Sequence, residues 1–336
     1  MSIEPAILER IDFFNSLHLI ILPTEKCNFR CTYCYEDFSH GVMPREIQDR
    51  LVRFLAMRIP KLRKLIISWF GGEPLLAPSV IKSIGFFAKS ECDKLNVEYI
   101  SDITTNGYLL DEECLDWCIT AGVKSYQITL DGVGKTHDQS RRLAGGGGTF
   151  EKVYGSLVRL KNRIENDLSV TIRAHVNAGT VKEASEFIKM LSTDFSGDER
   201  FRVLIRSVGN FGGSNGSNVK EVNDREVIDS LQEFAKSLGL NIVNSNLSDY
   251  ICYASKPNSF VVRSNGTLGK CTVALNDAEN NIGEITATGE VAVDHRLLRT
   301  WIAGLESGNR QELACPNSIR SFPVKIIAQD PPQKLA

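Results

Sequence analysis

The stretch Cys27-Asn28-Phe29-Arg30-Cys31-Thr32-Tyr33-Cys34-Tyr35 carries three cysteines in the spacing C-x3-C-x2-C, followed directly by an aromatic residue. Thiolates are the ligands of iron–sulfur clusters, and a four-iron cluster normally takes four of them. A loop with three cysteines leaves one iron open, and an open position lets a metal site act on a bound molecule. A zinc site with a fourth ligand from elsewhere is the alternative.

A glycine-rich turn follows the next strand-like run, residues 64–70, as Gly71-Gly72-Glu73-Pro74. The two glycines leave backbone groups open to close approach by a ligand, and the carboxylate of Glu73 can receive an ammonium group. With this turn downstream of the cysteine loop, the chain resembles the radical S-adenosylmethionine (SAM) enzymes.

The resemblance implies a pair of cofactors and a chemistry. In these enzymes the three cysteines hold a [4Fe–4S] cluster whose free iron chelates the amino and carboxylate groups of SAM. Reduction of the cluster, by a donor such as flavodoxin or ferredoxin, cleaves SAM to methionine and a 5′-deoxyadenosyl radical that abstracts hydrogen from the substrate. The implied cluster ligands are Cys27, Cys31 and Cys34, and the implied SAM contacts are Gly71, Gly72, Glu73 and Pro74.

Strand-like and helix-like segments alternate through residues 1–208. Strands are predicted at 18–22, 65–70, 97–103, 125–130, 169–176 and 201–207, and helices at 45–59, 79–95, 111–121, 150–166 and 182–191. Such alternation produces right-handed crossovers and a parallel sheet. Because six units are too few to close an eight-stranded barrel, we expect a partial (β/α)6 TIM-like barrel.

The polar motifs all follow predicted strands. The segments that follow the first four strands are 27–35, 71–74, 104–107 and 131–132, and Asn177 and Arg206 lie at the ends of the last two. Barrel enzymes place catalysis at the carboxyl ends of their strands. The sequence therefore predicts one rim that carries the whole site.

Further cofactor contacts follow from the resemblance. The hydroxyl of Thr129 is expected near the SAM carboxylate, and Arg141 is expected to pair with that carboxylate in bidentate fashion. The neighbouring Arg142 is the alternative choice. Tyr33 is expected to pack near the adenine, or to be a packing residue only.

Two rim residues have two interpretations each. Asn106 contacts the SAM ribose or the substrate, and Asp131 is the candidate catalytic residue that faces the substrate. Both also precede glycine, as ordinary turn residues do. The run Gly145–Gly148 lacks the lysine of a phosphate-binding loop and is expected to lead into a helix with Thr149 as its N-cap.

A break follows the barrel. We take residues 209–246 as a linker and bridging helix, because the Gly/Ser/Asn-rich run 209–218 is too polar to pack and is typical of a mobile linker or a loop over the barrel mouth.

A second cysteine pattern follows the linker. Cys252, Gly266 and Cys271 have the spacing C-x13-G-x4-C, with a hairpin expected around Asn265-Gly266. This spacing resembles the opening of the SPASM extension of radical SAM peptide maturases, which houses auxiliary clusters.

The extension, residues 247–336, then departs from that pattern. A complete extension continues as C-x2-C-x5-C-x3-C, but here Cys315 is followed by Pro316-Asn317-Ser318 and by no further cysteine. A loose C-terminal tail is expected. Cys252, Cys271 and Cys315 either hold an auxiliary iron–sulfur cluster or belong to a purely structural, truncated extension.

Composition excludes several classes of function. The formal charge is −2, from 39 basic and 41 acidic residues, which does not favour a nucleic-acid partner. Neither a membrane-length apolar run nor a signal peptide is present. Nine cysteines, an odd number, favour a reducing compartment over a disulfide framework. We therefore expect a cytoplasmic enzyme without a membrane partner.

Three functions remain open. The favoured one is a peptide maturase that forms a side-chain cross-link or an epimer in a ribosomally made precursor peptide. Only 26 residues precede Cys27, so we expect no leader-binding module there and recognition by the barrel mouth, the extension or a separate leader-peptide-binding protein. The alternatives are an anaerobic sulfatase-maturating (formylglycine-forming) enzyme, which usually has an aspartate where this chain has Thr272, and a catalytically degenerate binding scaffold.

Overall fold

The computed structural model describes residues 15–243 and 250–319. Within these residues the main sheet has ten strands in the order β12-β11-β10-β9-β1-β3-β4-β5-β7-β8. The parallel strands of the barrel are β1 (Ser16–Ile21), β3 (Lys64–Trp69), β4 (Glu98–Thr105), β5 (Val123–Leu130), β7 (Ser169–Val176) and β8 (Phe201–Ser207). Most of the expected C-terminal tail lies outside the described residues.

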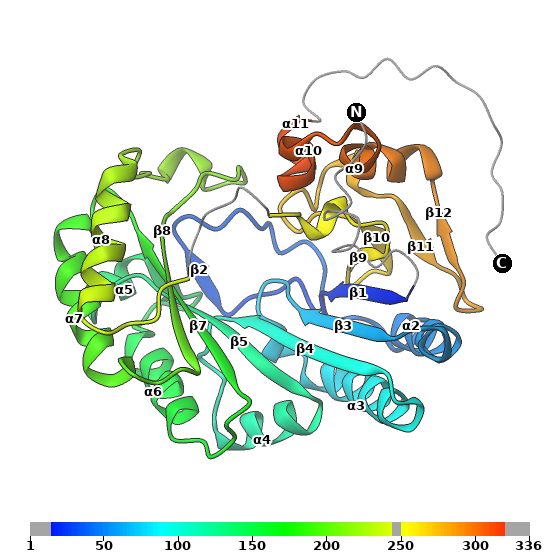
Figure 1. Cartoon of the computed structure of the whole chain (residues 1–336), viewed down its shortest axis with the longest axis horizontal. Helices are drawn as coiled ribbons and strands as arrows, with labels where there is room; N and C mark the ends of the chain where they lie inside the picture. Colours follow the sequence, from blue (N-terminus) through cyan, green and yellow to red (C-terminus); the bar gives the residue numbers. More distant parts are fainter. Residues whose placement is uncertain (1–14, 244–249, 320–336) are drawn as a thin grey trace.

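Helices cover the convex side of this sheet (Figure 1). They are α2 (Arg45–Arg58), α3 (Pro78–Leu95), α4 (Glu112–Thr120), α6 (Phe150–Lys161), α7 (Ala184–Phe195) and α8 (Arg225–Ser237). The first five each separate two consecutive barrel strands, and α8 follows the last one. The expected partial (β/α)6 barrel is therefore confirmed.

The two faces of the sheet differ in polarity. The fully buried residues of β3 are Leu65, Ile67 and Trp69. Trp69 packs against Gly85 of α3, so this apolar face meets the helices. On the other face Ser68 donates a 2.7 Å hydrogen bond to Asp102 and lies 2.9 Å from the Nε2 atom of His18. The concave side of the barrel is therefore lined by polar groups.

A two-stranded antiparallel sheet, absent from the sequence predictions, lies on the concave side (Figure 1). In it β2 (Phe29–Cys31) pairs with β6 (Arg141–Leu143), and Cys31 stands opposite Arg141. The short helix α5 (Lys135–Ser140) leads into β6, and the Ser140 carbonyl accepts a 2.9 Å hydrogen bond from the Thr32 backbone. The pairing ties the cysteine loop to the segment after β5.

The start of α6 differs from the sequence prediction, because the side chain of Thr149 does not cap this helix. The Asp138 carboxylate accepts hydrogen bonds from the backbone N–H groups of Thr149 and Phe150, at 2.7 and 2.9 Å. Gly148 makes room for it, since a Cβ at that position would lie 2.3 Å from the carboxylate. The Thr149 hydroxyl instead donates to the Arg141 carbonyl and holds β6 in place.

The extension continues the barrel sheet. β9 (Ser259–Val262) pairs in parallel with β1, and β10 (Thr267–Gly269), β11 (Gly283–Ile285) and β12 (Val291–Val293) follow antiparallel. The expected hairpin is thus confirmed as β9–β10. Helices α9 (His295–Ser307), α10 (Arg310–Ala314) and α11 (Pro316–Ile319) lie beside these strands (Figure 1). The boundary at residue 247 remains our proposal for the division of the chain.

The Gly/Ser/Asn-rich stretch packs on the cysteine loop. Gly213 has φ +75° and approaches so closely that a Cβ there would lie 2.6 Å from the Tyr35 carbonyl oxygen. The Asn215 amide donates a 3.2 Å hydrogen bond to the Cys34 carbonyl, and the rings of Phe211 and Tyr35 meet edge to face at 5.8 Å. The expectation that this stretch is too polar to pack is wrong.

Candidate active site

The three cysteines of the loop after β1 are free thiols that share one neighbourhood. Burial raises the pKa of the Cys27 thiol to about 12 and that of Cys34 to about 11, and the neighbouring thiols add to both shifts. The Cys27 sulfur accepts a 3.3 Å hydrogen bond from the Phe29 backbone N–H. The three thiols form a compact donor set on one loop.

The glycine turn lies directly against this loop. A Cβ on Gly71, which has φ +117°, would lie 2.3 Å from the Thr24 carbonyl oxygen, and one on Gly72 would lie 2.5 Å from that of Lys26. Real Cβ atoms do not approach so closely, so only glycine fits at either position. The Glu73 backbone N–H adds a 3.0 Å hydrogen bond to the Lys26 carbonyl. The sequence grouped these two motifs, and the structure brings them into contact.

Glu73 itself faces inward. Its side chain has no exposed surface, and its carboxylate accepts hydrogen bonds from the Thr105 hydroxyl at 2.7 Å and the Asn106 backbone N–H at 2.7 Å. A third hydrogen bond, of 3.0 Å, comes from the Leu75 backbone N–H. Burial raises the pKa of this carboxyl, although these donors oppose the shift. Pro74 continues this turn as a buried residue. The carboxylate thus joins the ends of β3 and β4.

Asn106 lies beside the cluster loop. Its side-chain amide donates a 2.8 Å hydrogen bond to the Asn28 side chain and lies 3.9 Å from the Cys27 sulfur, while its side-chain oxygen accepts from the Tyr108 backbone N–H. It is only 6% exposed. The sequence placed Asn106 near SAM or in a turn, and the structure shows it closing the turn and contacting the cysteine loop.

The Tyr33 hydroxyl joins three partners from three segments. It donates to the Asp131 carboxylate at 3.1 Å, accepts from Arg141 at 2.7 Å and lies 3.2 Å from the Nδ1 atom of His175. The other oxygen of Asp131 accepts a 2.6 Å hydrogen bond from Ser140. Asp131 is 2% exposed, and burial raises its pKa. His175 carried no sequence signal, because a histidine at a strand end belongs to no motif.

Arg141 and Arg142 point in different directions. Arg141 is 7% exposed and Arg142 is exposed, so the structure brings only Arg141 into the site. The buried Nε of Arg141 has no hydrogen-bond partner among the described residues. Thr129, also buried, lies on β5, the main-sheet strand that precedes Arg141 in the chain. An unmatched guanidinium N–H beside the cysteines can receive an anionic group.

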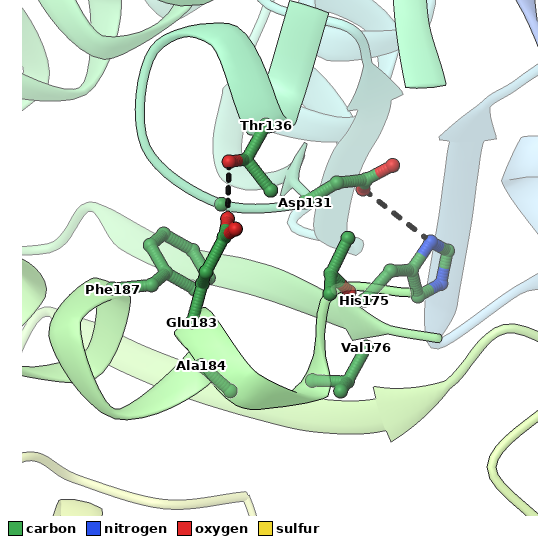
Figure 2. A pocket seen from close by; sticks show the side chains of 9 residues that line it. Asp131, Thr136, His175, Val176, Glu183, Ala184 and Phe187 are labelled. Atoms are coloured by element: carbon green, nitrogen blue, oxygen red, sulfur yellow. Dashed lines mark hydrogen bonds and ion pairs between the residues drawn. The ribbon is translucent and has the colours of Figure 1, made fainter. Parts of the chain in front are cut away.

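Two cavities flank this network. A cavity of about 10 Å³ between the ends of β5 and β7 has room for about one water molecule. Figure 2 shows Asp131 and His175 pointing toward each other at its edge, with 3.8 Å between Oδ1 and Nδ1. A second cavity, of about 250 Å³, is lined by residues that include Thr32, Tyr33 and Asn177. The larger cavity therefore opens beside the Tyr33 network.

The extension reaches the same rim through a buried ion pair. The Arg263 guanidinium donates to both oxygens of Glu25, at 2.9 and 2.7 Å, and to the Leu275 carbonyl at 2.6 Å. Glu25 is 2% exposed and precedes the cluster loop. Neither residue was singled out from the sequence, since no local spacing connects them.

The cysteines of the extension also approach one another. Burial raises the pKa of the Cys252 thiol, and the nearby thiols of Cys271 and Cys315 raise it further. Cys271 is buried and Cys315 is exposed. Within residues 15–243 and 250–319, no group of three or more His, Cys, Asp or Glu side chains is arranged to hold a single metal ion. An auxiliary cluster at these cysteines stays a prediction.

The family profile of the Radical SAM superfamily matches residues 21–191, which is half of the chain. The chain belongs to the Radical SAM superfamily. Its cofactors are accordingly a [4Fe–4S] cluster and SAM. The residues present fit both, because three free thiols share one loop and the Arg141 Nε is unmatched beside them.

The radical SAM chain has curated relatives with different activities. It is 30% identical over 218 residues to the GTP 3′,8-cyclase of Aliarcobacter butzleri (strain RM4018), covering 62% of this chain and 60% of that protein. It is 28% identical over 187 residues to the cysteine-type anaerobic sulfatase-maturating enzyme of Clostridium novyi (strain NT), covering 52% and 47%. The chain thus spans less than two thirds of the length of these relatives.

Solved structures share the fold. The structure of anSMEcpe with bound AdoMet and the Cp18Cys peptide has a TM-score of 0.65 at 19% identity, with 86% of this chain and 84% of that chain covered. Streptococcus suis SuiB bound to the precursor peptide SuiA has a TM-score of 0.59 at 17% identity, with 95% and 70% covered. At these identities the likeness shows the fold alone. Among the described residues, no helix is both long and apolar enough to cross a membrane.

Proposed function

We propose that this radical SAM enzyme abstracts a hydrogen atom from a peptide and so installs a cross-link or an epimer in a ribosomally made precursor. For a cross-link the second hydrogen would leave as a proton and its electron would pass to an oxidised iron–sulfur cluster. For an epimer a thiol would return a hydrogen atom to the opposite face of the carbon radical. The observation that carries the proposal is the direct attachment of the extension to the cluster loop. β9 pairs with β1, and Arg263 binds Glu25 just ahead of Cys27. A peptide in the polar hollow would then lie between the cluster loop and the cysteines of the extension.

Each rim residue has a proposed part in this reaction. When bound, a reduced [4Fe–4S] cluster supplies the electron that cleaves SAM and releases a 5′-deoxyadenosyl radical. Cys27, Cys31 and Cys34 would hold the cluster. The Nε of Arg141, with the hydroxyl of Thr129, would bind the SAM carboxylate.

The contact with the SAM amino group is assigned to backbone atoms of Gly71 and Gly72. The carboxylate of Glu73 already accepts three hydrogen bonds from the chain, so we assign it the positioning of the turn. Asp131 has both oxygens engaged, and we narrow its predicted catalytic role to positioning the Tyr33 hydroxyl. Tyr33 lines the larger cavity, where we place the adenosyl group.

Several partners belong to this proposal. The cluster needs an external electron donor, such as flavodoxin or ferredoxin, and its thiols suit a reducing cytoplasm. A separate leader-binding protein would complete precursor recognition. Cys252, Cys271 and Cys315 would hold an auxiliary cluster with one open position, since three thiolates leave a four-iron cluster one ligand short.

The first experiment measures 5′-deoxyadenosine formed from SAM by anaerobically reconstituted protein with a strong reductant. We expect product from the natural chain and none from Cys31→Ala. Product from both would remove the assignment of the cysteine loop. Incubation with candidate precursor peptides then tests the substrate, by loss of two mass units for a cross-link or by deuterium incorporation for an epimer.

A second candidate function follows from sequence identity, because the chain is 30% identical over 218 residues to a GTP 3′,8-cyclase. The same reconstituted protein, incubated with GTP and SAM, separates the two candidates. We expect no GTP-dependent increase in 5′-deoxyadenosine. A clear increase, with consumption of GTP, would replace the peptide proposal.

A further inference from the structure

Two arginines of the hollow take no part in the site above. Arg173 lies on β7 and Arg206 lies on β8. We propose that Arg173 and Arg206 form a binding site for a carboxylate side chain of the substrate. The inference rests on the proposed function and names the substrate class, a peptide with an aspartate or glutamate near the residue that is modified.

The strand register places the two side chains on the hollow side of the sheet. Arg173 pairs with Thr129 of β5, and Arg206 pairs with His175 of β7. Arg173 and His175 are two residues apart on one strand, so both face the same side. The His175 ring contacts Tyr33 on the concave side. Both arginines therefore project toward the candidate active site.

Neither guanidinium is neutralised by the part of the chain that the structure describes. No ion pair or side-chain hydrogen bond of Arg173 or Arg206 is formed within residues 15–243 and 250–319, and the Nε of Arg173 is buried without a partner. Both arginines are half-buried, and a buried N–H without an acceptor, such as the Nε of Arg173, is unfavourable, so a bound anion would stabilise it. Carboxylates suit this position because arginine binds them in bidentate fashion.

The residues near Arg173 and Arg206 include His175 on the barrel side and Tyr250 of the extension. Burial, together with Arg173, Arg141 and Arg206, lowers the pKa of His175 well below its usual value, so the ring stays neutral and adds no competing charge. The positive charge of Arg206 also opposes the rise that burial causes in the pKa of Tyr250, a residue of the extension. The register places both arginines beside His175, whose ring contacts Tyr33 of the cluster loop, and we place the proposed peptide along this side of the sheet.

A single carboxylate fits better than a polyphosphate. Burial raises the pKa of Tyr35, the charge of Glu36 adds to this rise, and the charge of Arg173 opposes it. The buried Oε2 of Glu36 has no hydrogen-bond partner among the described residues. Asp131 adds a second carboxyl on the same rim. Burial raises the pKa of Glu36 to about 8, so this carboxyl is mostly protonated near neutral pH and does not repel an anion. The choice of a carboxylate rests on charge balance, because a polyphosphate carries more negative charge than Arg173 and Arg206 together can offset.

Binding of a blocked amino acid tests the inference on the full-length, cluster-loaded protein, anaerobically and without reductant. The probe is N-acetyl-L-glutamate α-amide, compared with the glutamine analogue, and ligand-observed NMR gives the dissociation constants. We expect binding of the glutamate probe only, weakened about ten- to hundred-fold in Arg173→Gln and in Arg206→Gln. Arg202→Gln is the matched control, because Arg202 is exposed on the same strand.

The outcomes separate this inference from the proposed function. Equal binding of both probes, or an equal loss in the Arg202→Gln control, would overturn the carboxylate site. GTP is tested in the same way. If GTP binds far more tightly than the glutamate probe, and if both arginine variants lose this binding, the site belongs to a nucleotide and the inference is overturned. Because the assay contains no reductant, failure to produce radicals cannot mimic either result.

Discussion

At the scale of single residues, the two adjacent arginines Arg141 and Arg142 differ in which side chain faces the candidate active site. The pairing of β2 with β6 puts Cys31 opposite Arg141, whose side chain turns inward to Tyr33. Arg142 points to solvent. Alternation of side chains along a strand makes this choice, and a motif read from sequence cannot make it.

Arg141→Gln should weaken SAM binding about ten- to hundred-fold, because a charge-assisted contact to the SAM carboxylate is lost. Arg142→Gln should leave SAM binding unchanged. Equilibrium dialysis with the cluster-loaded protein measures both, and thermal unfolding checks that Arg141→Gln remains folded. Equal losses in the two variants would count against the assignment of Arg141.

Gly72→Ala should impair cluster retention and SAM binding, because its Cβ would lie 2.5 Å from the Lys26 carbonyl oxygen. Gly155→Ala is the matched control, since α6 has open space at that position. Removing a helical glycine should stabilise the control by about 0.5–1 kcal/mol. Iron content per chain and urea unfolding distinguish the two variants. A Gly72→Ala protein with full iron content and SAM affinity would refute the close-contact argument.

At the scale of elements, a polar row crosses β1, β3 and β4 inside the barrel. It runs from His18 through the Ser68 hydroxyl to Asp102. Burial raises the pKa of Asp102 to about 6, while burial and nearby lysines lower that of His18 to about 4. Both groups are therefore driven toward their neutral forms, as polar residues facing a hollow of low dielectric should be.

The carboxyl of Asp102 should make stability fall with rising pH. Its folded pKa lies above its unfolded value, so the folded state binds the extra proton and this contribution is lost between about pH 4 and 6. Relative to Asp102→Asn, the natural chain should lose about 1 kcal/mol of unfolding free energy between pH 5 and 7.5. Urea unfolding at both values measures this difference. Parallel pH profiles for the two proteins would contradict it.

At the scale of the whole molecule, the Arg263–Glu25 pair connects the extension to the cluster loop. Their side chains are 10% and 2% exposed, respectively. Removing one partner of a buried pair leaves an uncompensated charge, which costs about 3–5 kcal/mol. This contact and the β1–β9 pairing make the barrel and the extension one continuous structure.

Arg263→Ala should therefore lower the unfolding free energy by about 3–5 kcal/mol and speed the loss of iron. Arg225→Ala, which removes a surface ion pair on α8, should change neither property measurably. Urea unfolding and the rate of iron release to a chelator measure the two effects. Similar behaviour of both variants would show that the buried pair does not couple the extension to the loop.

Much of the barrel was predictable because hydrophobic periodicity is local. The predicted bounds of β7 and β8, residues 169–176 and 201–207, agree with the structure at both ends. The pairing of β2 with β6 was missed, since three-residue strands carry no periodic signal. The continuation of the barrel sheet into β9 was missed for a similar reason, because pairing between distant strands leaves no local pattern.

The sequence by itself determined the chemistry of this protein, namely three thiols in one loop, a turn that only glycine can adopt, and a rim of polar residues after parallel strands. The tertiary structure decided which of these groups stay open to a ligand. Glu73 and Asp131 are engaged by partners from other segments of the chain, while the Nε of Arg141 is left unmatched. Spacing along the chain records which groups are present, whereas hydrogen-bond partners from distant segments determine which of them are already satisfied.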